Sequence, residues 1–379
     1  MQRLRTTPRP DWQKIVESQG FLFHSPDEQP YWDEGVYYRF TSAEIDAVEK
    51  ASYALNDMCL KAVQHVIDNK LFERFTIPPP FVDYVVSSWE RDEFTLYGRF
   101  DLAFDGRNPP KLLEYNADTP TSLLEAAVIQ WHWMKDMLAR PGSKIDQFNS
   151  IHERLIEAWR SFKSIYDGTL YFSAMADVVE DHMTVAYLRD TAAQAGMETR
   201  YIAVEQIGWD RDRRCFVDEF AQQIGCCFKL YPWEWMVREQ FAPNLLEGNT
   251  RWLEAPWKMI LSNKAILAVL WELFPDSPYL LPAAFDPEPV GPSYVRKPIL
   301  GREGANVTVT VNGRTTLETE GIYGGPYVYQ RLYPLPRFDG QYPVIGSWMV
   351  NGYACGMGIR EDATPVTGNT SRFVPHVFA

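Results

Sequence analysis

The sequence predicts an α+β protein of about two or three domains, and three observations support this class. The chain has 379 residues, which exceeds the usual size of one domain. Hydrophobic residues make up 46% of the sequence and charged residues 23%, as in folded globular proteins. Strand and helix patterns alternate over residues 169–206, whereas strand patterns dominate residues 293–359. We therefore expect a larger body and a small α/β unit.

Two amphipathic helices are expected in the first half of the chain. The first covers residues 41–74, where a TSAE capping signal precedes apolar residues at helical spacing and a Pro-Pro-Pro run follows. The second covers residues 123–138, because Ser122 and Glu125 have capping-box spacing and Pro120 suits a first turn. Shorter helices are expected over residues 181–194 and 263–274.

Strands are expected where short runs of β-branched and aromatic residues lie between turn signals. The turn signal DGRNPP separates the first two of them. The expected strands cover residues 96–104, 111–117, 170–174, 198–204, 293–300, 306–311, 327–331, 344–350 and 353–359.

Composition excludes several classes of partner. Acidic residues outnumber basic ones by 50 to 37, and no extended run of Lys or Arg is present, so no nucleic acid is expected. No window approaches about 18 consecutive apolar residues, and the first residues lack an apolar signal segment. The 5 cysteines form no C-x-x-C motif, which fits a reducing compartment. We expect a cytoplasmic protein without a membrane partner.

The first two strands are expected to pair as an antiparallel hairpin. We place Phe104 opposite Lys111 across the turn, and this register decides which residues share a face. One face then carries apolar residues and is expected to lie in the core. Its members are Phe100, Leu102, Phe104, Leu113 and Tyr115.

The opposite face of this hairpin gathers polar side chains. In the same register Asp101 faces Glu114, and Arg99 faces Asn116. Two carboxylates and an amide oxygen on rigid strands suit Mg²⁺, which takes oxygen ligands and leaves further positions to water and phosphate. Arg99 would neutralise negative charge that develops beside the metal. An ordinary solvated face with cross-strand ion pairs is an equal alternative on spacing alone.

Three further segments carry residues suited to phosphate or carboxylate binding. Lys297 lies on a strand before a loop that contains Gly301 and Gly304, whose N–H groups could face phosphate oxygens. Lys264 is expected in the first turn of a helix, where a cation opposes the helix dipole. Arg360 ends a strand in an Arg-Glu-Asp run. A plain hairpin turn, a solvated Lys and a charged turn are the respective alternatives.

The motifs together resemble the glutathionylspermidine synthase family. The resemblance starts at LLEYNADTPTSLLEA and extends to GRFDLAF, FKLYPWEW, SNKAIL, KPILGREGANV, VYQ and GMGIRED, so it covers nearly the whole chain. It implies an ATP-grasp fold in which the metal motif precedes the two lysines, a circularly shifted connectivity. Residues 1–165 and 255–379 would form the ATP-grasp body, and residues 166–254 would form a small α/β (preATP-grasp-like) domain on the substrate side.

The resemblance also implies roles for individual residues. Asp101, Glu114 and Asn116 would hold Mg²⁺, and Arg99 would assist formation of an acyl phosphate. Arg360 matches an active-site arginine of the family. The nucleotide site would consist of phosphate-binding lysines, a mobile glycine loop over 301–306 and a residue at the adenine. Its residues would be Lys264, Lys297, Gly301, Gly304, Asn306 and Gln330.

The activity implied by the resemblance is ATP- and Mg²⁺-dependent ligation of a carboxylate to an amine through an acyl phosphate. A peptide carboxylate and a polyamine or amino acid are the expected substrates. The bifunctional members also carry an N-terminal amidase domain, which this sequence is not expected to contain, and the stretch ADTPTS departs from theirs. Two alternatives are a nucleotide-binding regulatory protein without turnover and a carbohydrate-active enzyme that uses paired carboxylates.

Overall fold

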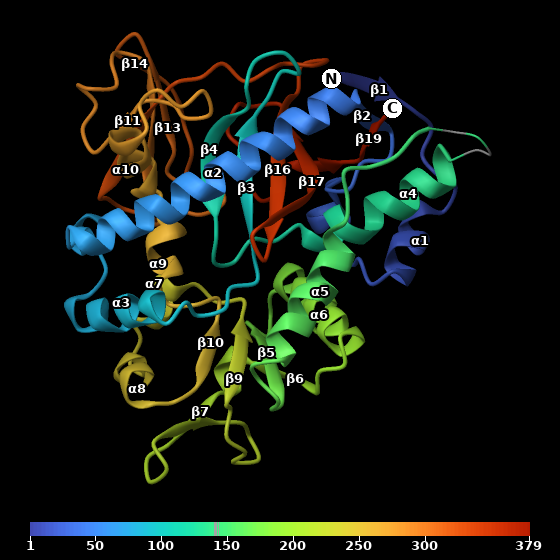
Figure 1. The fold of residues 1–379 in the computed structure, drawn as a ribbon. Coiled ribbons are helices and arrows are strands. Elements are labelled where there is room, and N and C mark those ends of the chain that lie inside the picture. Colours follow the sequence, from blue (N-terminus) through green and yellow to red (C-terminus); the bar gives the residue numbers. More distant parts are fainter. Residues whose placement is uncertain (140–141, 143) are drawn as a thin grey trace.

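The computed structural model describes residues 1–139, 142 and 144–379. Within these residues, three larger sheets organise the molecule, and both chain termini lie near one another on one side of it (Figure 1). Two of these sheets have five antiparallel strands each, and the third has four parallel strands. The expected α+β class is therefore confirmed as a mixed α/β structure.

The central sheet has the strand order β18-β17-β16-β3-β4. A long helix, α2 (Ser42–Asp68), crosses this sheet and packs on β16 and β17 (Figure 1). The hydroxyl groups of Ser52 and Ser347 meet at 2.7 Å in this contact. The strands of the sheet are β3 (Tyr97–Ala103), β4 (Lys111–Asn116), β16 (Tyr342–Val350), β17 (Tyr353–Asp362) and β18 (Arg372–Val374).

The second five-stranded sheet has the order β11-β15-β12-β13-β14, and α10 (Ile266–Leu273) packs on β11 and β15. Its last strand, β14, is absent from the sequence-based expectation, because its exposed polar residues carry no apolar alternation. The strands are β11 (Ala283–Ala284), β12 (Tyr294–Pro298), β13 (Thr308–Val311), β14 (Arg314–Glu318) and β15 (Tyr327–Arg331).

The four-stranded parallel sheet has the order β10-β9-β5-β6, and α5 (Ile151–Lys163) packs on α6 (Val179–Gln194) beside it. The expected β-α-β unit is confirmed, because α6 connects β5 to β6 and the two strands are parallel. This sheet lies within residues 166–254, but the proposed division into domains stays a prediction. The strands are β5 (Leu170–Ala174), β6 (Thr199–Ala203), β9 (Cys226–Lys229) and β10 (Arg251–Leu253).

Short elements complete the described chain. They are β1 (Gln2–Arg5), α1 (Trp12–Ser18), η1 (Pro26–Glu28), β2 (Val36–Phe40), η2 (Leu71–Phe75), η3 (Pro79–Phe81), α3 (Val82–Glu90), η4 (Glu125–Ile129), α4 (Gln130–Met137), η5 (Val204–Gln206), β7 (Gly208–Asp210), β8 (Cys215–Val217), α7 (Trp233–Met236), α8 (Ala242–Glu247), α9 (Lys258–Leu261) and β19 (His376–Phe378). None of the described helices combines the length and apolar character that a membrane span requires.

The two expected capping boxes have different outcomes. The capping box at Thr41 and Glu44 is present, although α2 ends at Asp68 and only a 3₁₀ turn follows. The capping box at Ser122 does not form. Ser122 has a φ of 65° and bonds Tyr31 instead, and the following turn, η4, is π-helical.

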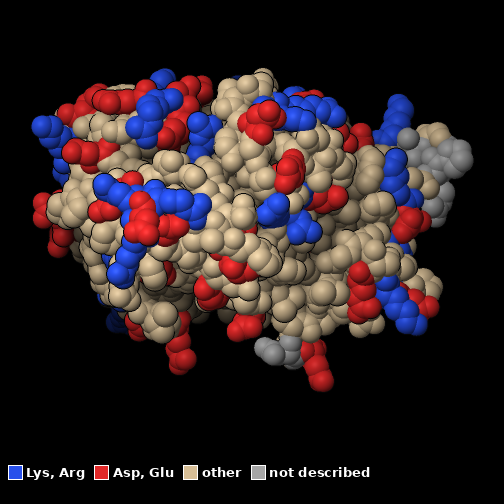
Figure 2. Space-filling view, turned by 90° about the horizontal axis from the view of Figure 1, so that it is seen from below, with Lys and Arg blue, Asp and Glu red and all other residues tan. Residues whose placement is uncertain are grey.

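The charged surface is mixed. On the face seen in Figure 2, acidic and basic side chains alternate over a mostly uncharged surface, without an extended patch of one sign. The formal net charge of -13 is therefore not gathered into one acidic patch on that face.

Candidate active site

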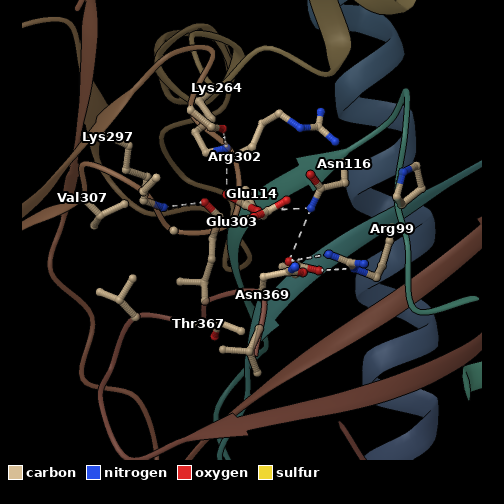
Figure 3. A pocket seen from close by; sticks show the side chains of 18 of the residues that line it. Arg99, Glu114, Asn116, Lys264, Lys297, Arg302, Glu303, Val307, Thr367 and Asn369 are labelled. Atoms are coloured by element: carbon tan, nitrogen blue, oxygen red, sulfur yellow. Dashed lines mark hydrogen bonds and ion pairs between the residues drawn. The ribbon is translucent and has the colours of Figure 1, made fainter. Parts of the chain in front are cut away.

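The hairpin of β3 and β4 brings the four polar side chains together as expected. Arg99 pairs with Asn116, and Asp101 pairs with Glu114, in the antiparallel register. The Asn116 amide nitrogen lies 3.1 Å from Glu114 Oε1 (Figure 3) and 3.4 Å from Asp101 Oδ2. Arg99 binds Asp101 through its Nε and a terminal nitrogen, at 2.6 and 3.1 Å. These groups form one cluster on one face of the hairpin.

The register near the turn differs from the expected one. Lys111 pairs with Ala103 rather than with Phe104, because a bulge between Asp101 and Leu102 leaves Leu113 without a paired residue. Leu112 therefore enters the core in place of Leu113 and is fully buried. Leu113 instead lines the cavity, where its carbonyl oxygen accepts a hydrogen bond from Lys297.

Two lysines from other elements act on Glu114, and one of them forms an ion pair with it. Lys264 Nζ lies 3.1 Å from Glu114 Oε2 and donates to the Gly301 carbonyl at 2.8 Å. Lys264 stands in the turn before α10, not in the first turn of a helix as expected. Lys297 projects from β12, and its ammonium group is bound by Leu113 and by Gln330 Oε1 at 2.9 Å.

Burial and the neighbouring charges shift the pKa values of both Glu114 and Lys297. Burial acts to raise the pKa of Glu114, but the charges of Lys264 and Lys297 outweigh it and lower that pKa well below the usual range. Burial lowers the pKa of Lys297 to about 8, and the neighbouring charge of Glu114 opposes this change. Glu114 is thus held ionised, whereas Lys297 titrates close to neutral pH.

Gln330 and Arg360 reach the same cavity from β15 and β17. Gln330 donates to the Leu112 carbonyl at 2.9 Å while it accepts from Lys297, so β4, β12 and β15 are joined at one point. Arg360 binds Asp101 Oδ2 at 3.1 Å from the side opposite Glu114. Asp101 therefore contacts two guanidinium groups.

The glycine loop lies at this cavity as expected, but only two of its three predicted residues line it. Gly301 and Gly304 line it, and Gly304 has a φ of 69°. Asn306 does not line the cavity. Its side chain bonds Gly321 and Tyr323 instead and fastens the loop to the following segment.

One cavity of about 300 Å³ contains all of the predicted site residues except Asn306. Apolar side chains from β12, β13 and β16 line it on the side of Gln330, and they include Val295, Val309 and Val344. Residues of the parallel sheet unit line the other side, among them Met175 and Tyr231. The cavity therefore lies where the three sheets meet.

Comparison with known proteins identifies the family. The sequence model described as "Glutathionylspermidine synthase preATP-grasp" matches residues 3–379. The chain belongs to the glutathionylspermidine synthase family. The resemblance that the motifs predicted is confirmed, and so is the enzyme class, ligase, at the level of the family.

Three relatives illustrate how the chain compares with other proteins. It is 44% identical to a protein of Haemophilus influenzae described as an acid–amine ligase, over 100% of both chains. It is 30% identical to trypanothione synthetase of Crithidia fasciculata, over 84% of this chain and 53% of that protein. It is also 30% identical to the bifunctional glutathionylspermidine synthetase/amidase of Escherichia coli, over 89% of this chain and 58% of that protein. The chain thus spans little more than half the length of the last two.

A solved structure supports the fold. A glutathione synthetase-like effector from Globodera pallida, in its apo form, aligns with a TM-score of 0.58 and 10% sequence identity. The alignment covers 97% of this chain and 96% of that one. At this identity the likeness concerns the fold alone.

The hairpin of this family member has ligands that suit a hard divalent cation. Asp101 and Glu114 supply carboxylate oxygens, and rotation of the Asn116 amide would bring its oxygen to the place that the nitrogen now occupies. Within the described chain, no three His, Cys, Asp or Glu side chains gather as a metal site. A cation at the hairpin would therefore depend on the amide and on substrate oxygens, as Mg²⁺ commonly does.

Several residues that line the cavity are missing from the sequence-based prediction. Arg302 donates to Thr119 at 2.9 Å and lies 3.8 Å from Glu234, so it connects the glycine loop to the loop after the hairpin and to α7. Glu180 and Asp181 line the cavity from the start of α6 and form its acidic wall. Acidic residues are common in the first turn of any helix, so the sequence pattern of α6 carried no functional signal.

The acidic groups of this wall are shifted toward the neutral form. Burial raises the pKa of Glu180, and burial together with Glu180 raises the pKa of Asp181 to about 7. The Asp181 carboxylate forms no hydrogen bond or ion pair with any side chain among the described residues.

Proposed function

We propose that this protein is an ATP- and Mg²⁺-dependent ligase that joins a carboxylate to an amine through an acyl phosphate. The observation that carries the proposal is a single cavity with a cationic end and an acidic end. Lysines and arginines gather around Asp101 and Glu114 at one end, and unpaired acidic groups lie at the other. Membership of the family supports the reaction class, and we propose the circularly shifted ATP-grasp connectivity with it.

The cationic end suits a nucleotide. Gln330 and the valines of β12, β13 and β16 offer a polar edge and an apolar wall to a flat base. Lys264 and Lys297 would meet the phosphates, and the loop of Gly301 and Gly304 would cover them with backbone N–H groups. Mg²⁺, held by the hairpin carboxylates and amide, would neutralise charge on the β- and γ-phosphates.

The transfer itself needs no covalent bond to the protein. A carboxylate oxygen of the acid attacks the γ-phosphorus of ATP, the bond to the bridging oxygen breaks, and ADP leaves. Arg99 and Arg360 would face the charge of the phosphoryl group that is transferred. The neutral amine then attacks the acyl carbon, inorganic phosphate leaves, and the amine nitrogen loses one proton.

The acidic end suits the amine. Glu180 and Asp181 have only distant cations to balance them, so a substrate ammonium group would supply the missing charge. From membership of the family, we propose a peptide carboxylate as the acid and a polyamine or amino acid as the amine. A regulatory protein that binds nucleotide without turnover is the competing function.

The decisive experiment measures ADP release by the purified protein with Mg-ATP across a panel of acids and amines. Glutathione, shorter peptides, spermidine and amino acids form the panel, and mass spectrometry identifies the products. The expected result is release that requires one acid–amine pair, with a product lighter by one water than their sum. ATP binding without release for any pair would contradict the ligase and favour the regulatory function.

A further inference from the structure

The loop Thr119–Ser122 follows the hairpin and lines the cavity with two threonine side chains. Three of its four residues accept hydrogen bonds from arginine or tyrosine side chains. Arg302 donates to Thr119 Oγ1, Tyr97 Oη donates to the Pro120 carbonyl at 3.2 Å, and Arg99 donates to the Thr121 carbonyl at 2.7 Å. These three contacts reach the loop from the glycine loop and from β3.

The fourth residue is held from the buried side. Ser122 Oγ lies 2.9 Å from Tyr31 Oη, and Tyr31 donates to Glu125 Oε1 at 2.9 Å. Tyr31 and Glu125 are each 2% exposed, so this chain of hydrogen bonds is shielded from solvent. Tyr31 belongs to the segment before β2, and Glu125 begins the π-helical turn η4. Neither residue lines the cavity.

Ser122 has a backbone conformation that its surroundings must stabilise. Its φ of 65° lies in the left-handed region, which disfavours residues with a Cβ atom and persists where surrounding groups enforce it. Tyr31 Oη donates its one proton to Glu125 Oε1 and therefore accepts the Ser122 proton. Burial raises the pKa of Glu125 to about 7, so these directions hold above that pH, where the carboxylate is ionised and only accepts. Arg99 and Glu180 are the charged groups that act on Glu125 from the cavity side.

We propose that Tyr31 and Glu125 are positioning residues. Through Ser122 they hold Thr121 and Arg99 at the part of the cavity beside Asp101, where the substrate acid would meet the phosphoryl group that is transferred. The inference rests on the proposed ligase for its kinetic consequence, but its structural part does not. Arg99 donates to the Thr121 carbonyl at 2.7 Å, so a displacement of Ser122 reaches Arg99 through the neighbouring residue. Arg99 keeps its two bonds to Asp101 in that case, and therefore the binding of the acid should suffer more than the chemical step.

The first test uses hydrogen–deuterium exchange and needs no substrate. In Tyr31→Phe, backbone amides over residues 119–128 should exchange about tenfold faster than in the wild type, while those of β3 and β4 stay unchanged. Tyr171→Phe is the matched control, because it removes a buried tyrosine hydroxyl bonded to Asp218 at 2.9 Å, away from the cavity. Equal exchange over residues 119–128 in both variants would overturn the proposal.

Variants of Glu125 separate a positioning role from a loss of folding. Glu125→Gln keeps an oxygen acceptor for Tyr31 and should exchange like the wild type, whereas Glu125→Ala should behave like Tyr31→Phe. If both Glu125 variants exchange alike, the hydrogen-bond chain does not position the loop. Ser122→Ala removes only the hydroxyl and serves as a third variant if Tyr31→Phe fails to fold.

The kinetic test applies to the acid that releases most ADP in the panel above. Tyr31→Phe and Glu125→Ala should raise KM for that acid about tenfold, with kcat and the KM for ATP changed less than about threefold. Glu125→Gln should keep the wild-type KM for the acid, because its amide oxygen still accepts from Tyr31. A fall in kcat alone would contradict the assignment to acid binding. If no acid supports release, the proposed ligase has failed, and the exchange experiment still decides whether Tyr31 positions the loop.

Discussion

At the hairpin end of the cavity, each carboxylate has cations within bonding distance, whereas at the α6 end the acidic groups are buried with few cations beside them. The pKa of Glu114 is lowered, because the charges of Lys264 and Lys297 outweigh its burial. The pKa of Asp181 is raised to about 7, because burial and Glu180 act in the same direction. The same burial therefore has opposite consequences, and the neighbouring cations decide which one prevails.

This difference assigns different tasks to the two ends. A set of fixed cations around ionised carboxylates is already arranged for phosphate and metal, so little has to move when they bind. Acidic groups without counterions are costly in the free protein, and a bound ammonium group would relieve that cost. The comparison predicts that changes at the hairpin end affect catalysis most and that changes at the α6 end affect pH dependence and stability.

The largest effect is expected for Glu114→Gln. The amide cannot supply the negative charge that a metal and two lysines require, so kcat should fall by about a thousandfold or more. Thermal denaturation should show that the fold is retained. Glu318→Gln is the control, and ADP release should be unchanged in it. Glu318 is an exposed residue of β14 that pairs with Arg296 of β12. Normal turnover in Glu114→Gln would disprove the metal assignment.

Lys297→Met should reduce kcat/KM for ATP by about a hundredfold, because the variant removes a buried cation from the proposed phosphate site. Initial rates at varied ATP concentration measure this effect. Lys111→Met is the matched control, since Lys111 also binds a backbone carbonyl, that of Pro278, but outside the cavity. Equal losses in the two variants would place the phosphates elsewhere.

The pH dependence of the reaction should report on both the α6 end and the hairpin end of the cavity. Asp181 ionises above about 7, so kcat/KM for the amine should rise about tenfold per pH unit below that value. Lys297 loses its proton above about 8, so the affinity for ATP should fall at higher pH. Asp181→Asn should remove the acid limb and leave the alkaline one. An unchanged acid limb in that variant would show that another group controls it.

The smallest effect concerns stability. Because the pKa of Asp181 is raised from 3.8 to about 7 on folding, its contribution is favourable below 3.8 and is lost as the pH rises through 7. Asp181→Asn should therefore raise Tm by roughly 1–3 °C at pH 8 and leave it unchanged near pH 4. Asp210→Asn is the control of opposite sign, since hydrogen bonds from Arg213 lower the pKa of Asp210. A loss of stability in Asp181→Asn at pH 8 would contradict the charge imbalance.

The sequence could predict the hairpin cluster because strand geometry is local. A two-residue period and one turn were enough to bring Arg99, Asp101, Glu114 and Asn116 to one face, although the bulge exchanged Leu112 for Leu113 in the core. Local patterns singled out Lys264 and Lys297, and motif resemblance added Gln330; the structure brings all three into the same cavity. Their roles in binding ATP and metal stay predictions.

The acidic wall and the Tyr31–Ser122–Glu125 chain were beyond sequence reasoning. Glu180 and Asp181 look like ordinary first-turn residues of a helix, and Ser122 with Glu125 looks like a capping box. The tertiary structure decided otherwise, since it buried Tyr31 against both residues and turned Ser122 into the left-handed region.

The sequence by itself determined the α+β class, the family, the hairpin face and the β-α-β unit, because periodicity, turns and motifs act over short stretches of chain. Only the tertiary structure decided which charges are neutralised, since the partners of Glu114 and Asp181 come from segments far away in the sequence. Burial and pairing distance set the protonation of a carboxylate, and neither is written in its local sequence.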